Sequence, residues 1–316
     1  MMTNEAAITR VKTANREEWR KLRSGYIGGS DAAAVVGLNP YASAYSLWAE
    51  KTGRTAGFAG NLATEVGTYL EEFVAKKFEQ ATGKKVRRCN QSILNSLYPW
   101  AIANIDREIV GEDAGLEIKT TDSLNMKKFS GGEYPANYYV QCVHYLAVTG
   151  KARWYLAVLI GNREFRHFTI ERDEGEIAAL MDAEDDFWQR VKNNTPPDAD
   201  GSQATTDTIK TIYAGGCEDA VCDLYPHKRD IEQYMAVSAR IKELEAAREE
   251  AANRIKAYMG NMTGGEWDRF RVTWRTQSRS TFDCKRFAQN NPNIDISAYY
   301  KTTTARIFRV SENKGE

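Results

Sequence analysis

The chain has 316 residues, of which 42% are hydrophobic and 7 are prolines, and its 43 basic side chains balance 43 acidic ones. This composition excludes a wholly disordered protein, and the length allows a large core without disulfides or structural metals. No stretch approaches the roughly 20 apolar residues of a membrane span, and the first residues lack the apolar core of a signal peptide. We therefore expect a globular protein that is neither inserted into a membrane nor exported.

The cysteines argue for a reducing compartment. Five of them lie at irregular spacings, at Cys89, Cys142, Cys217, Cys222 and Cys284. An odd number without a regular pattern does not fit a secreted disulfide framework, so we expect a cytoplasmic protein.

Charge is segregated along the chain although its sum is zero. Residues 171–200 contain ten acidic and three basic side chains, whereas residues 267–309 contain nine basic and three acidic ones. A net charge of zero gives no overall attraction to nucleic acid, so any binding of DNA depends on this local segregation.

Residue periodicity predicts an α/β domain in the first part of the chain. Residues 64–82 carry apolar side chains at helical spacing, and Gly83 is a suitable stop for that helix. A shorter helix at residues 30–36 has Ser30 or Asp31 as its candidate N-cap. In chain order, the patterns predict helices at 16–22, 30–36, 64–82 and 136–149, and strands at 100–110, 116–121, 153–160 and 164–170.

A break near residues 193–206, which are rich in Pro, Gly, Asp and Ser, ends this domain. Beyond it, one long helix is predicted, followed by short strands at 269–277 and 305–310. We therefore divide the chain into a first domain at 1–200, a linker at 201–228, a long helix at 229–260 and a small basic, aromatic subdomain at 261–316.

The final segment interleaves aromatic and basic residues, which leaves two interpretations open. Basic grooves with aromatic platforms bind single-stranded nucleic acid. Alternatively, the aromatic residues form the core of a small β subdomain and the arginines are simply exposed. The aromatic residues are Trp267, Phe270, Trp274, Phe282, Phe287, Tyr299, Tyr300 and Phe308.

The strand pair in the middle of the first domain carries the most informative cluster. Because side chains alternate along a strand, Glu117 and Lys119 share one face, and Leu116 and Ile118 lie on the other, buried face. The turn-rich sequence between the two predicted strands favours a hairpin. Such a hairpin brings Asp106 beside Glu117.

Two carboxylates that meet at one point repel each other, and a divalent cation relieves the repulsion. Oxygen ligands favour Mg²⁺, with Mn²⁺ as a substitute, and the three histidines, His144, His167 and His227, lack the spacing of a zinc site. Such a cation polarises a phosphodiester and lowers the pKa of a bound water, while Lys119 orients that water or offsets charge on the phosphate. The cluster indicates metal-assisted hydrolysis, and the alternative is a solvated group of salt bridges.

Four motifs occur in an order that is far more specific than any one of them. They are Lys21–Asp31 (KLRSGYIGGSD) with the following VVGLNPY and LWAEKTG, Gly67–Glu71 (GTYLE), Ile105–Asp106 with Glu117–Lys119, and Gln141 with His144 and Tyr145. Over about residues 16–160 the chain thereby resembles the YqaJ-like phage recombination exonucleases, relatives of bacteriophage lambda exonuclease in the PD-(D/E)XK nuclease superfamily. The resemblance implies an α/β, restriction-endonuclease-like core with a mixed central sheet flanked by helices, followed by a long helix and a small β-containing subdomain.

The resemblance also implies a metal site. Asp106, Glu117 and the backbone carbonyl of Ile118 would bind the metal, and Glu71 would complete the site from its helix. The family has Glu-Pro after the helical leucine, whereas this chain has Glu71 followed by Glu72, so the choice between these two glutamates stays open.

Further roles follow from the same resemblance. Lys119 would be the catalytic lysine, and Gln141, on the helix after the catalytic strands, would help to position the water or the scissile strand; His144 has a supporting role at most. In lambda exonuclease the first motif holds the 5′ phosphate of the DNA end, which points here to Arg23 and Ser30. A guanidinium, and a hydroxyl at a helix N-terminus, are suitable groups for a terminal phosphate.

The function implied is a Mg²⁺-dependent 5′-to-3′ exonuclease that resects linear double-stranded DNA and leaves 3′ overhangs for recombination by single-strand annealing. The family also implies a phage or prophage gene in a bacterial host, an annealing partner of the RecT or Redβ type, and a ring-shaped homotrimer. The alternatives are an endonuclease, a Cas4-like nuclease or a non-catalytic DNA-binding scaffold. A Cas4-like protein needs closely spaced cysteines for an iron–sulfur cluster, and this chain lacks them.

Overall fold

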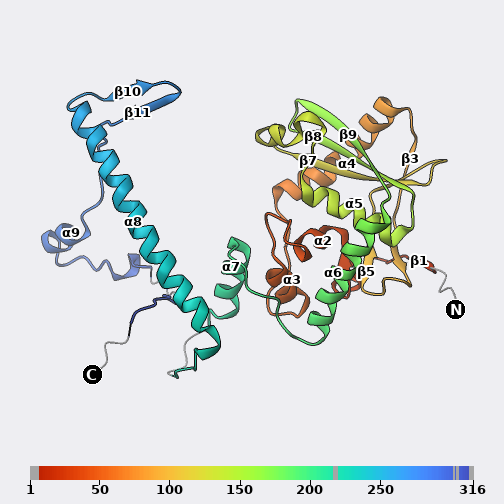
Figure 1. The fold of residues 1–316 in the computed structure, drawn as a ribbon, viewed down its shortest axis with the longest axis horizontal. Helices are drawn as coiled ribbons and strands as arrows, with labels where there is room; N and C mark the ends of the chain where they lie inside the picture. The colour runs from red at the N-terminus through yellow and green to blue at the C-terminus, as the bar shows by residue number, and fades with distance from the viewer. Residues whose placement is uncertain (1–6, 216–219, 302, 304–305, 313–316) are drawn as a thin grey trace. The chain divides into compact units, whose positions relative to one another are not determined.

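The computed structural model describes residues 7–215, 220–301, 303 and 306–312, and the chain divides into two compact units, residues 1–215 and 216–316 (Figure 1). The helices of the first unit are α1 (Arg16–Ser24), α2 (Gly29–Val35), α3 (Ala44–Lys51), α4 (Leu62–Thr82), α5 (Ala136–Thr149), α6 (Glu174–Lys192) and α7 (Gln203–Ile212). Its strands are β1 (Ile8–Val11), β2 (Ile27–Gly28), β3 (Val86–Arg88), β4 (Ser92–Asn95), β5 (Ala101–Ala103), β6 (Arg107–Ile109), β7 (Ala114–Thr121), β8 (Arg153–Ile160) and β9 (Glu164–Glu171), and a 3-10 segment, η1, covers Ser123–Gly132.

The strands of the first unit form two sheets. The larger is mixed, in the order β3-β6-β7-β8-β9, with β7 and β8 parallel and the other pairs antiparallel. The smaller has the order β1-β4-β5-β2. The expected mixed α/β class, with a mixed central sheet flanked by helices and a long helix in the C-terminal part, is confirmed.

The strand predicted at residues 100–110 is in fact two strands in different sheets. β5 belongs to the smaller sheet and β6 to the larger one, and residues 104–106 connect them outside either ladder. The break has a physical cause, because the Asp106 carboxylate accepts the N–H of Ile118 and so replaces a backbone partner at the start of the β6–β7 hairpin. The hairpin itself is confirmed, with Arg107 opposite Leu116.

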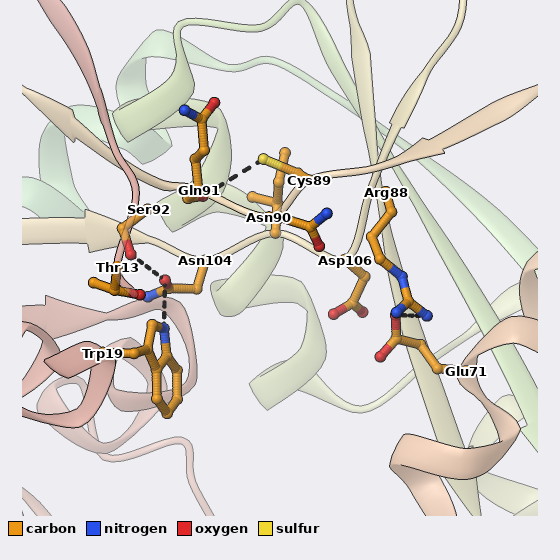
Figure 2. Close-up of a pocket in the computed structure, with 11 residues that line it drawn as sticks. Thr13, Trp19, Glu71, Arg88, Cys89, Asn90, Gln91, Ser92, Asn104 and Asp106 are labelled. Carbon is orange, nitrogen blue, oxygen red and sulfur yellow. Dashed lines mark hydrogen bonds and ion pairs between the residues drawn. The ribbon is translucent and has the colours of Figure 1, made fainter. Parts of the chain in front are cut away.

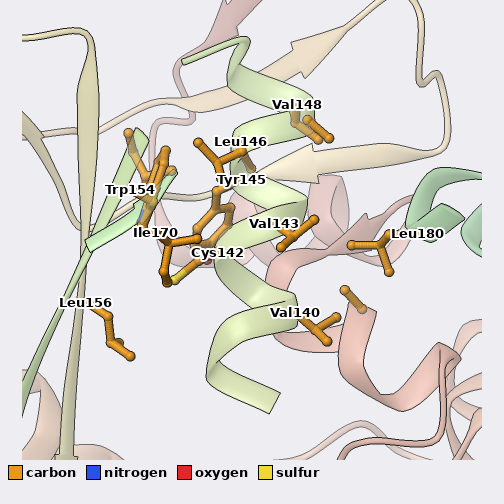
Figure 3. Close-up of a cluster of buried hydrophobic side chains, with 14 of the residues drawn as sticks. Val140, Cys142, Val143, Tyr145, Leu146, Val148, Trp154, Leu156, Ile170 and Leu180 are labelled. Carbon is orange, nitrogen blue, oxygen red and sulfur yellow. The ribbon is translucent and has the colours of Figure 1, made fainter. Parts of the chain in front are cut away.

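Strand β7 is covered on both faces. Leu116 and Ile118 pack against Val74 and Phe78 of α4, as the alternation predicts. The opposite face is covered by α5, whose apolar side chains meet β8 and β9 around Trp154 (Figure 3). A strand between two helices has no open face, so the side of β7 that carries Glu117 is buried as well.

Two glycines allow the closest contacts in this layer. A Cβ atom on Gly115 of β7 would lie 2.2 Å from the Trp154 ring, and one on Gly29 of α2 would lie 2.5 Å from the Tyr145 ring. Real Cβ atoms do not approach other atoms so closely, so only glycine lets the backbone lie directly against these rings.

The helix ends agree with the sequence patterns except at α2. Helix α4 stops at Gly83 in the left-handed conformation, with φ of 73°, as predicted. The N-cap of α2 is Gly28, not Ser30 or Asp31. Asp31 instead lies in the first turn, where its carboxylate accepts the N–H of Gly28 at 3.1 Å.

Part of the expected linker is a packed helix. Within residues 201–228, α7 starts after an N-cap at Ser202 and packs Ile209 and Ile212 against the cluster around α3. The hydroxyl of Thr205 also donates to that of Ser43 at 2.7 Å. The Ser- and Gly-rich sequence is thus a turn before a helix, and the first unit reaches residue 215 rather than 200.

The second unit contains the predicted long helix, α8 (Lys228–Met259), preceded by the 3-10 turn η2 (Tyr225–His227). An antiparallel hairpin of β10 (Gly264–Trp267) and β11 (Phe270–Thr273) follows, then α9 (Cys284–Asn290) and a 3-10 turn, η3 (Ser297–Tyr299). The strand expected at 305–310 is not present in the described residues 306–310, and Ala305 lies outside the described residues.

The aromatic side chains of the hairpin do not form a core. Trp267 is 76% exposed, Phe270 53% and Trp274 47%, so the interpretation as a buried β subdomain is wrong for these residues. In the described part of the chain, no helix is both long and apolar enough to cross a membrane.

Candidate active site

The β6–β7 hairpin brings the predicted acidic pair together. Arg107 pairs with Leu116, so the next position back places Asp106 opposite Glu117. The Asp106 carboxylate lies over β7, where its Oδ2 accepts the N–H of Ile118 at 2.8 Å. The expected juxtaposition of the two acidic residues is therefore present.

Glu117 is held by two donors and retains one free oxygen. Its side chain is 4% exposed, and its Oε1 accepts hydrogen bonds from Lys119 Nζ at 2.6 Å and from Gln141 Nε2 at 2.7 Å. Its Oε2 is buried and has no hydrogen-bond partner among the residues that the structure describes. A buried carboxylate oxygen without a partner is costly, so this atom calls for a further cation or donor.

The pKa shifts in the cluster also favour the binding of a cation. Burial, and then the charge of Glu117, raise the pKa of Asp106 well above its ordinary value. Burial opposes the charge of Lys119, but the Glu117 carboxylate outweighs it and raises the pKa of the lysine. Lys119 is thus a stable ammonium that serves Glu117, while the Asp106 carboxylate lacks a positive partner of its own.

The donor set of this pair fits a divalent cation. Carboxylate oxygens are the ligands that Mg²⁺ and Mn²⁺ prefer, and one of the Glu117 oxygens has no hydrogen-bond partner among the described residues. Ile118, whose carbonyl is the third predicted ligand, lies at the same point of β7 because its N–H binds Asp106.

Glu71 faces the same site but is engaged elsewhere. Figure 2 shows the Glu71 and Asp106 carboxylates pointing toward each other across one cavity, with Arg88 beside Glu71. Glu71 is bonded to the guanidinium of Arg107. Within the described residues, no three His, Cys, Asp or Glu side chains converge as metal ligands, so Glu71 has to leave Arg107 to join the pair.

The structure distinguishes the two adjacent glutamates. Glu71 lines the cavity, whereas Glu72 does not; the Glu72 side chain is 57% exposed and lies 3.2 Å from Arg107. Of the two, only Glu71 is directed toward Asp106.

Arg107 is a site residue that the sequence reasoning missed. Its side chain is 3% exposed, and it contacts both Glu71 and Glu72 as well as the Asp106 carbonyl oxygen at 2.8 Å. A buried arginine needs such partners. The signal available in the sequence was an arginine directly after the candidate metal ligand Asp106, in a chain that also carries two adjacent glutamates, Glu71 and Glu72.

Helix α5 supplies the residues that hold Glu117 in place. Gln141 Nε2 lies 2.9 Å from the hydroxyl of Tyr145, which in turn donates to the carbonyl of Asn104 at 3.0 Å. Gln141 is therefore brought into the site as expected, and Tyr145, one turn along, fixes it to the segment before Asp106.

His144 does not reach this site. It is fully buried, with Nδ1 2.8 Å from Glu184 of α6 and Nε2 3.1 Å from the Ile102 carbonyl. The Ile102 carbonyl is an acceptor, and so is the Glu184 carboxylate when it is ionised, so these two partners favour a ring that donates from both nitrogens. Burial opposes the positive charge of such a ring, but Glu184 outweighs it and raises the pKa of His144. The pair ties α5 to α6 and does not contribute to the site.

The residues expected to bind a 5′ phosphate meet at the end of α1. Arg23 donates to the hydroxyl of Ser30 at 2.6 Å and to Asp31 at 2.9 Å. Lys51 also binds Asp31, at 2.9 Å. Burial works against the charge of Asp31, but Lys51 and Arg23 outweigh it and lower the pKa of this carboxyl. Arg23 is therefore anchored by Asp31.

One cavity is lined by both Asp106 and Trp19. Its volume is about 400 Å³. The Trp19 indole donates to Asn104 at 2.9 Å, and the Arg23 guanidinium lies 5.7 Å from the centre of the Trp19 ring. Arg23 therefore contacts a residue of the cavity wall but does not line the cavity itself.

Comparison with known proteins assigns the family. The sequence matches the YqaJ-like viral recombinase domain over residues 18–152. It is also 36% identical over 318 residues to the uncharacterized protein YqaJ of Bacillus subtilis (strain 168), covering 98% of this chain and 99% of that protein. The chain belongs to the YqaJ-like viral recombinase family.

Two solved structures show weaker likenesses to this YqaJ-like chain. An alkaline exonuclease from Laribacter hongkongensis has a TM-score of 0.49 at 22% identity, with 56% of this chain and 93% of that chain covered. A phage-related exonuclease from Haemophilus somnus 129PT has a TM-score of 0.38 at 12% identity, with 58% and 90% covered. The family assignment rests on the Bacillus relative, not on these two.

The YqaJ-like domain contains the whole site. Residues 18–152 include Arg23, Ser30, Glu71, the β6–β7 hairpin and Gln141. They exclude all of α6 and the entire second unit.

Proposed function

We propose that this protein is a Mg²⁺-dependent exonuclease that degrades one strand of linear double-stranded DNA from its 5′ end and leaves a 3′ overhang. The observation that carries the proposal is the Asp106 and Glu117 pair, with an unpartnered buried oxygen on Glu117 and the Lys119 ammonium at 2.6 Å. Membership of the YqaJ-like viral recombinase family supports a role in recombination.

The chain's own residues have distinct parts in this reaction. Asp106, Glu117 and the Ile118 carbonyl would hold the cation, joined by Glu71 once it leaves Arg107. The cation would act as the Lewis acid that polarises the phosphodiester and activates water. Lys119 would stabilise charge that develops on the phosphate, and Gln141 keeps the Glu117 carboxylate in position.

The 5′ polarity rests on Arg23 and Ser30. A guanidinium and a hydroxyl 2.6 Å apart suit a terminal phosphate. Because Asp31 already holds the Arg23 guanidinium in place, phosphate binding costs little side-chain conformational entropy. The cavity wall that runs from Trp19 to Asp106 supports a path between this end site and the cleavage site.

Digestion of end-labelled linear duplexes tests the proposal. We expect faster degradation of duplexes with a 5′ phosphate than of those with a 5′ hydroxyl, release of label from 5′ ends first, and no cleavage when EDTA removes Mg²⁺. Equal rates on both ends, degradation from 3′ ends, or nicking of a covalently closed circle would contradict the proposed exonuclease.

The Lys119→Ala variant locates the chemistry. Loss of a group that stabilises the transition state should lower the cleavage rate by roughly 10²-fold or more, with duplex binding retained. Lys127→Ala is a matched control, because this lysine lies in η1 outside the cluster. A Lys119→Ala enzyme that cleaves at the wild-type rate would refute the site assignment and favour a binding protein without catalysis.

Partners and assembly follow from the family. We propose that the 3′ overhang passes to a single-strand annealing protein of the RecT or Redβ type, and that the protein forms a ring-shaped homotrimer around its DNA in the cytoplasm of a bacterial host. Light scattering of the purified protein, and co-purification with the annealing protein, test these two statements.

A further inference from the structure

We propose that one face of the β10–β11 hairpin is a binding site for single-stranded DNA. In an antiparallel pair, opposite residues and residues two apart lie on the same face. Trp267 pairs with Phe270 and Gly265 with Val272, and the N–H of Trp274 bonds to the Thr263 carbonyl at 3.1 Å, which continues the ladder. The resulting hairpin face carries Trp267, Phe270, Val272 and Trp274.

The aromatic rings of the hairpin face are open to solvent. Trp267 is 76% exposed, Phe270 53% and Trp274 47%. The Trp267 and Phe270 rings are nearly parallel, with an angle of 8° and centroids 6.0 Å apart, so they form a flat, stepped surface. Exposed apolar surfaces of this kind are interaction sites, and flat rings are the surfaces on which bases stack.

Gly265 leaves a gap on this same face. It stands opposite Val272, between the Trp267–Phe270 pair and Trp274, and a Cβ atom built on it has no neighbour within 4 Å. Its backbone is not in the left-handed region, so the strand does not require glycine there. Close approach by a ligand is one of the reasons for which strands contain glycine, and the open space above Gly265 fits that reason.

The charge around the hairpin face identifies the ligand as a polyanion. The Arg269 guanidinium lies 5.3 Å from the centre of the Phe270 ring at the hairpin turn, and Arg275 follows Trp274. Residues 261–312 contain nine basic and five acidic side chains. Aromatic rings beside arginines suit a nucleic acid whose bases are unpaired, because a duplex hides the faces of its bases.

This inference goes beyond the proposed nuclease function, because binding at the hairpin face needs neither metal nor cleavage. The fluorescence anisotropy of a labelled oligothymidylate measures it with the full-length Lys119→Ala protein in EDTA. Trp267→Ala and Trp274→Ala each remove one stacking ring, and each should weaken oligothymidylate binding by about tenfold. Tyr258→Ala is the matched control, since this tyrosine is 94% exposed but lies on α8.

Gly265→Val separates binding from folding. Valine favours a strand, so the hairpin should be at least as stable, yet the side chain fills the gap and should weaken oligothymidylate binding by about tenfold. Circular dichroism and thermal unfolding verify that each variant is folded. For the protein with the hairpin face intact, the logarithm of the binding constant for oligothymidylate should also fall linearly with the logarithm of the salt concentration.

Three results would overturn the inference. The first is equal oligothymidylate affinity of the Trp267→Ala, Trp274→Ala and Tyr258→Ala proteins. The second is unchanged oligothymidylate binding in Gly265→Val. The third is that the Trp267→Ala and Trp274→Ala proteins lose self-association in light scattering but still bind oligothymidylate. The last result would identify the face as a contact between copies. An inactive wild-type nuclease would not alter any of these measurements, so the two proposals fail separately.

Discussion

Three buried charged side chains in this protein are each paired with one or two side chains of opposite charge. Glu117 is neutralised by Lys119, Asp31 by Lys51 and Arg23, and His144 by Glu184. Among the described residues, Glu117 and Glu184 each have a buried oxygen without a hydrogen-bond partner. Glu117 is the candidate for chemistry because Asp106, which lies opposite it, lines a cavity. Asp31 and His144 have a partner for each charge and stabilise the fold.

Glu71 and Glu72 should differ in their effect on cleavage. Glu71→Gln removes a carboxylate that lines the cavity with Asp106, so we expect a loss of roughly 10-fold to 100-fold in rate or Mg²⁺ affinity. Glu72→Gln should change either by less than about threefold, because Glu72 lies outside the cavity wall. Rates measured over a Mg²⁺ titration compare the two; equal losses would contradict the assignment of Glu71.

The His144 and Glu184 pair predicts a pH-dependent stability. Glu184 raises the pKa of His144 above its ordinary value of about 6.5. A raised pKa stabilises the fold below the unfolded value, and this contribution is lost as the pH rises through the folded pKa. In Glu184→Gln the histidine loses the main group that raises its pKa, while burial still lowers the pKa against the smaller effects of the Ile102 carbonyl and Asp31.

The Glu184→Gln substitution should therefore destabilise the protein more at pH 6 than at pH 9. We expect a loss of about 3 kcal/mol or more at pH 6, typical of a buried pair that loses one partner. Urea unfolding at the two pH values gives the free energy of unfolding of each protein. The difference between the two proteins removes the contribution of titrating groups that both proteins share. A loss that is independent of pH would show that His144 is neutral.

At the scale of elements, the position of Asp106 depends on contacts between helices and strands. Helix α5 lies between the sheet, α2 and α6, and it holds Glu117 through Gln141 and the segment before β6 through Tyr145. The Tyr145 ring can occupy this place only because α2 begins with Gly29. The contact of Gly29 with the Tyr145 ring therefore links α2, which carries the proposed phosphate-binding residue Ser30, to the helix that holds Glu117.

Gly29→Ala should destabilise the protein. Alanine is the better helix residue, but its Cβ would lie 2.5 Å from the Tyr145 ring, so we expect a loss of about 1–3 kcal/mol from overpacking. Gly201→Ala is the control, because a Cβ there meets nothing within 4 Å and the change should stay within about 0.5 kcal/mol. Denaturant unfolding compares the two, and a neutral Gly29→Ala would contradict the close contact.

At the scale of the whole molecule, the site belongs to one unit. The three buried apolar clusters consist of residues between Ile27 and Ile212, all within residues 1–215. The second unit consists of a helix whose side chains are mostly exposed and of the hairpin. Folding of the first unit therefore relies on its own core.

A chain that ends at Gly215 should fold and keep the cleavage activity of the full protein. Its buried clusters are complete, including the contact of α7 with α3, so its thermal transition should stay cooperative. It should lose most of its affinity for oligothymidylate, because the hairpin face is removed. An unfolded chain would contradict the division into units, and unchanged oligothymidylate affinity would contradict the hairpin inference.

The sequence by itself determined the local features of this protein. The helices at 64–82 and 136–149, the hairpin that places Asp106 by Glu117, and the long helix after the first unit all follow from spacing over a few residues. Gly83 ends its helix as predicted because a glycine adopts the left-handed conformation without strain. Such features depend on neighbours in the chain, which the sequence displays directly.

Only the tertiary structure decided which partners the other buried charges have. The break between β5 and β6, the burial of Arg107 against Glu71, and the pairing of His144 with Glu184 join residues that lie 12 to 40 positions apart. No periodicity records such pairs, because their energies depend on burial and on partners from other elements. The same reason explains α7, whose polar, Ser-rich start predicts a linker until its isoleucines are seen to pack against the cluster at α3.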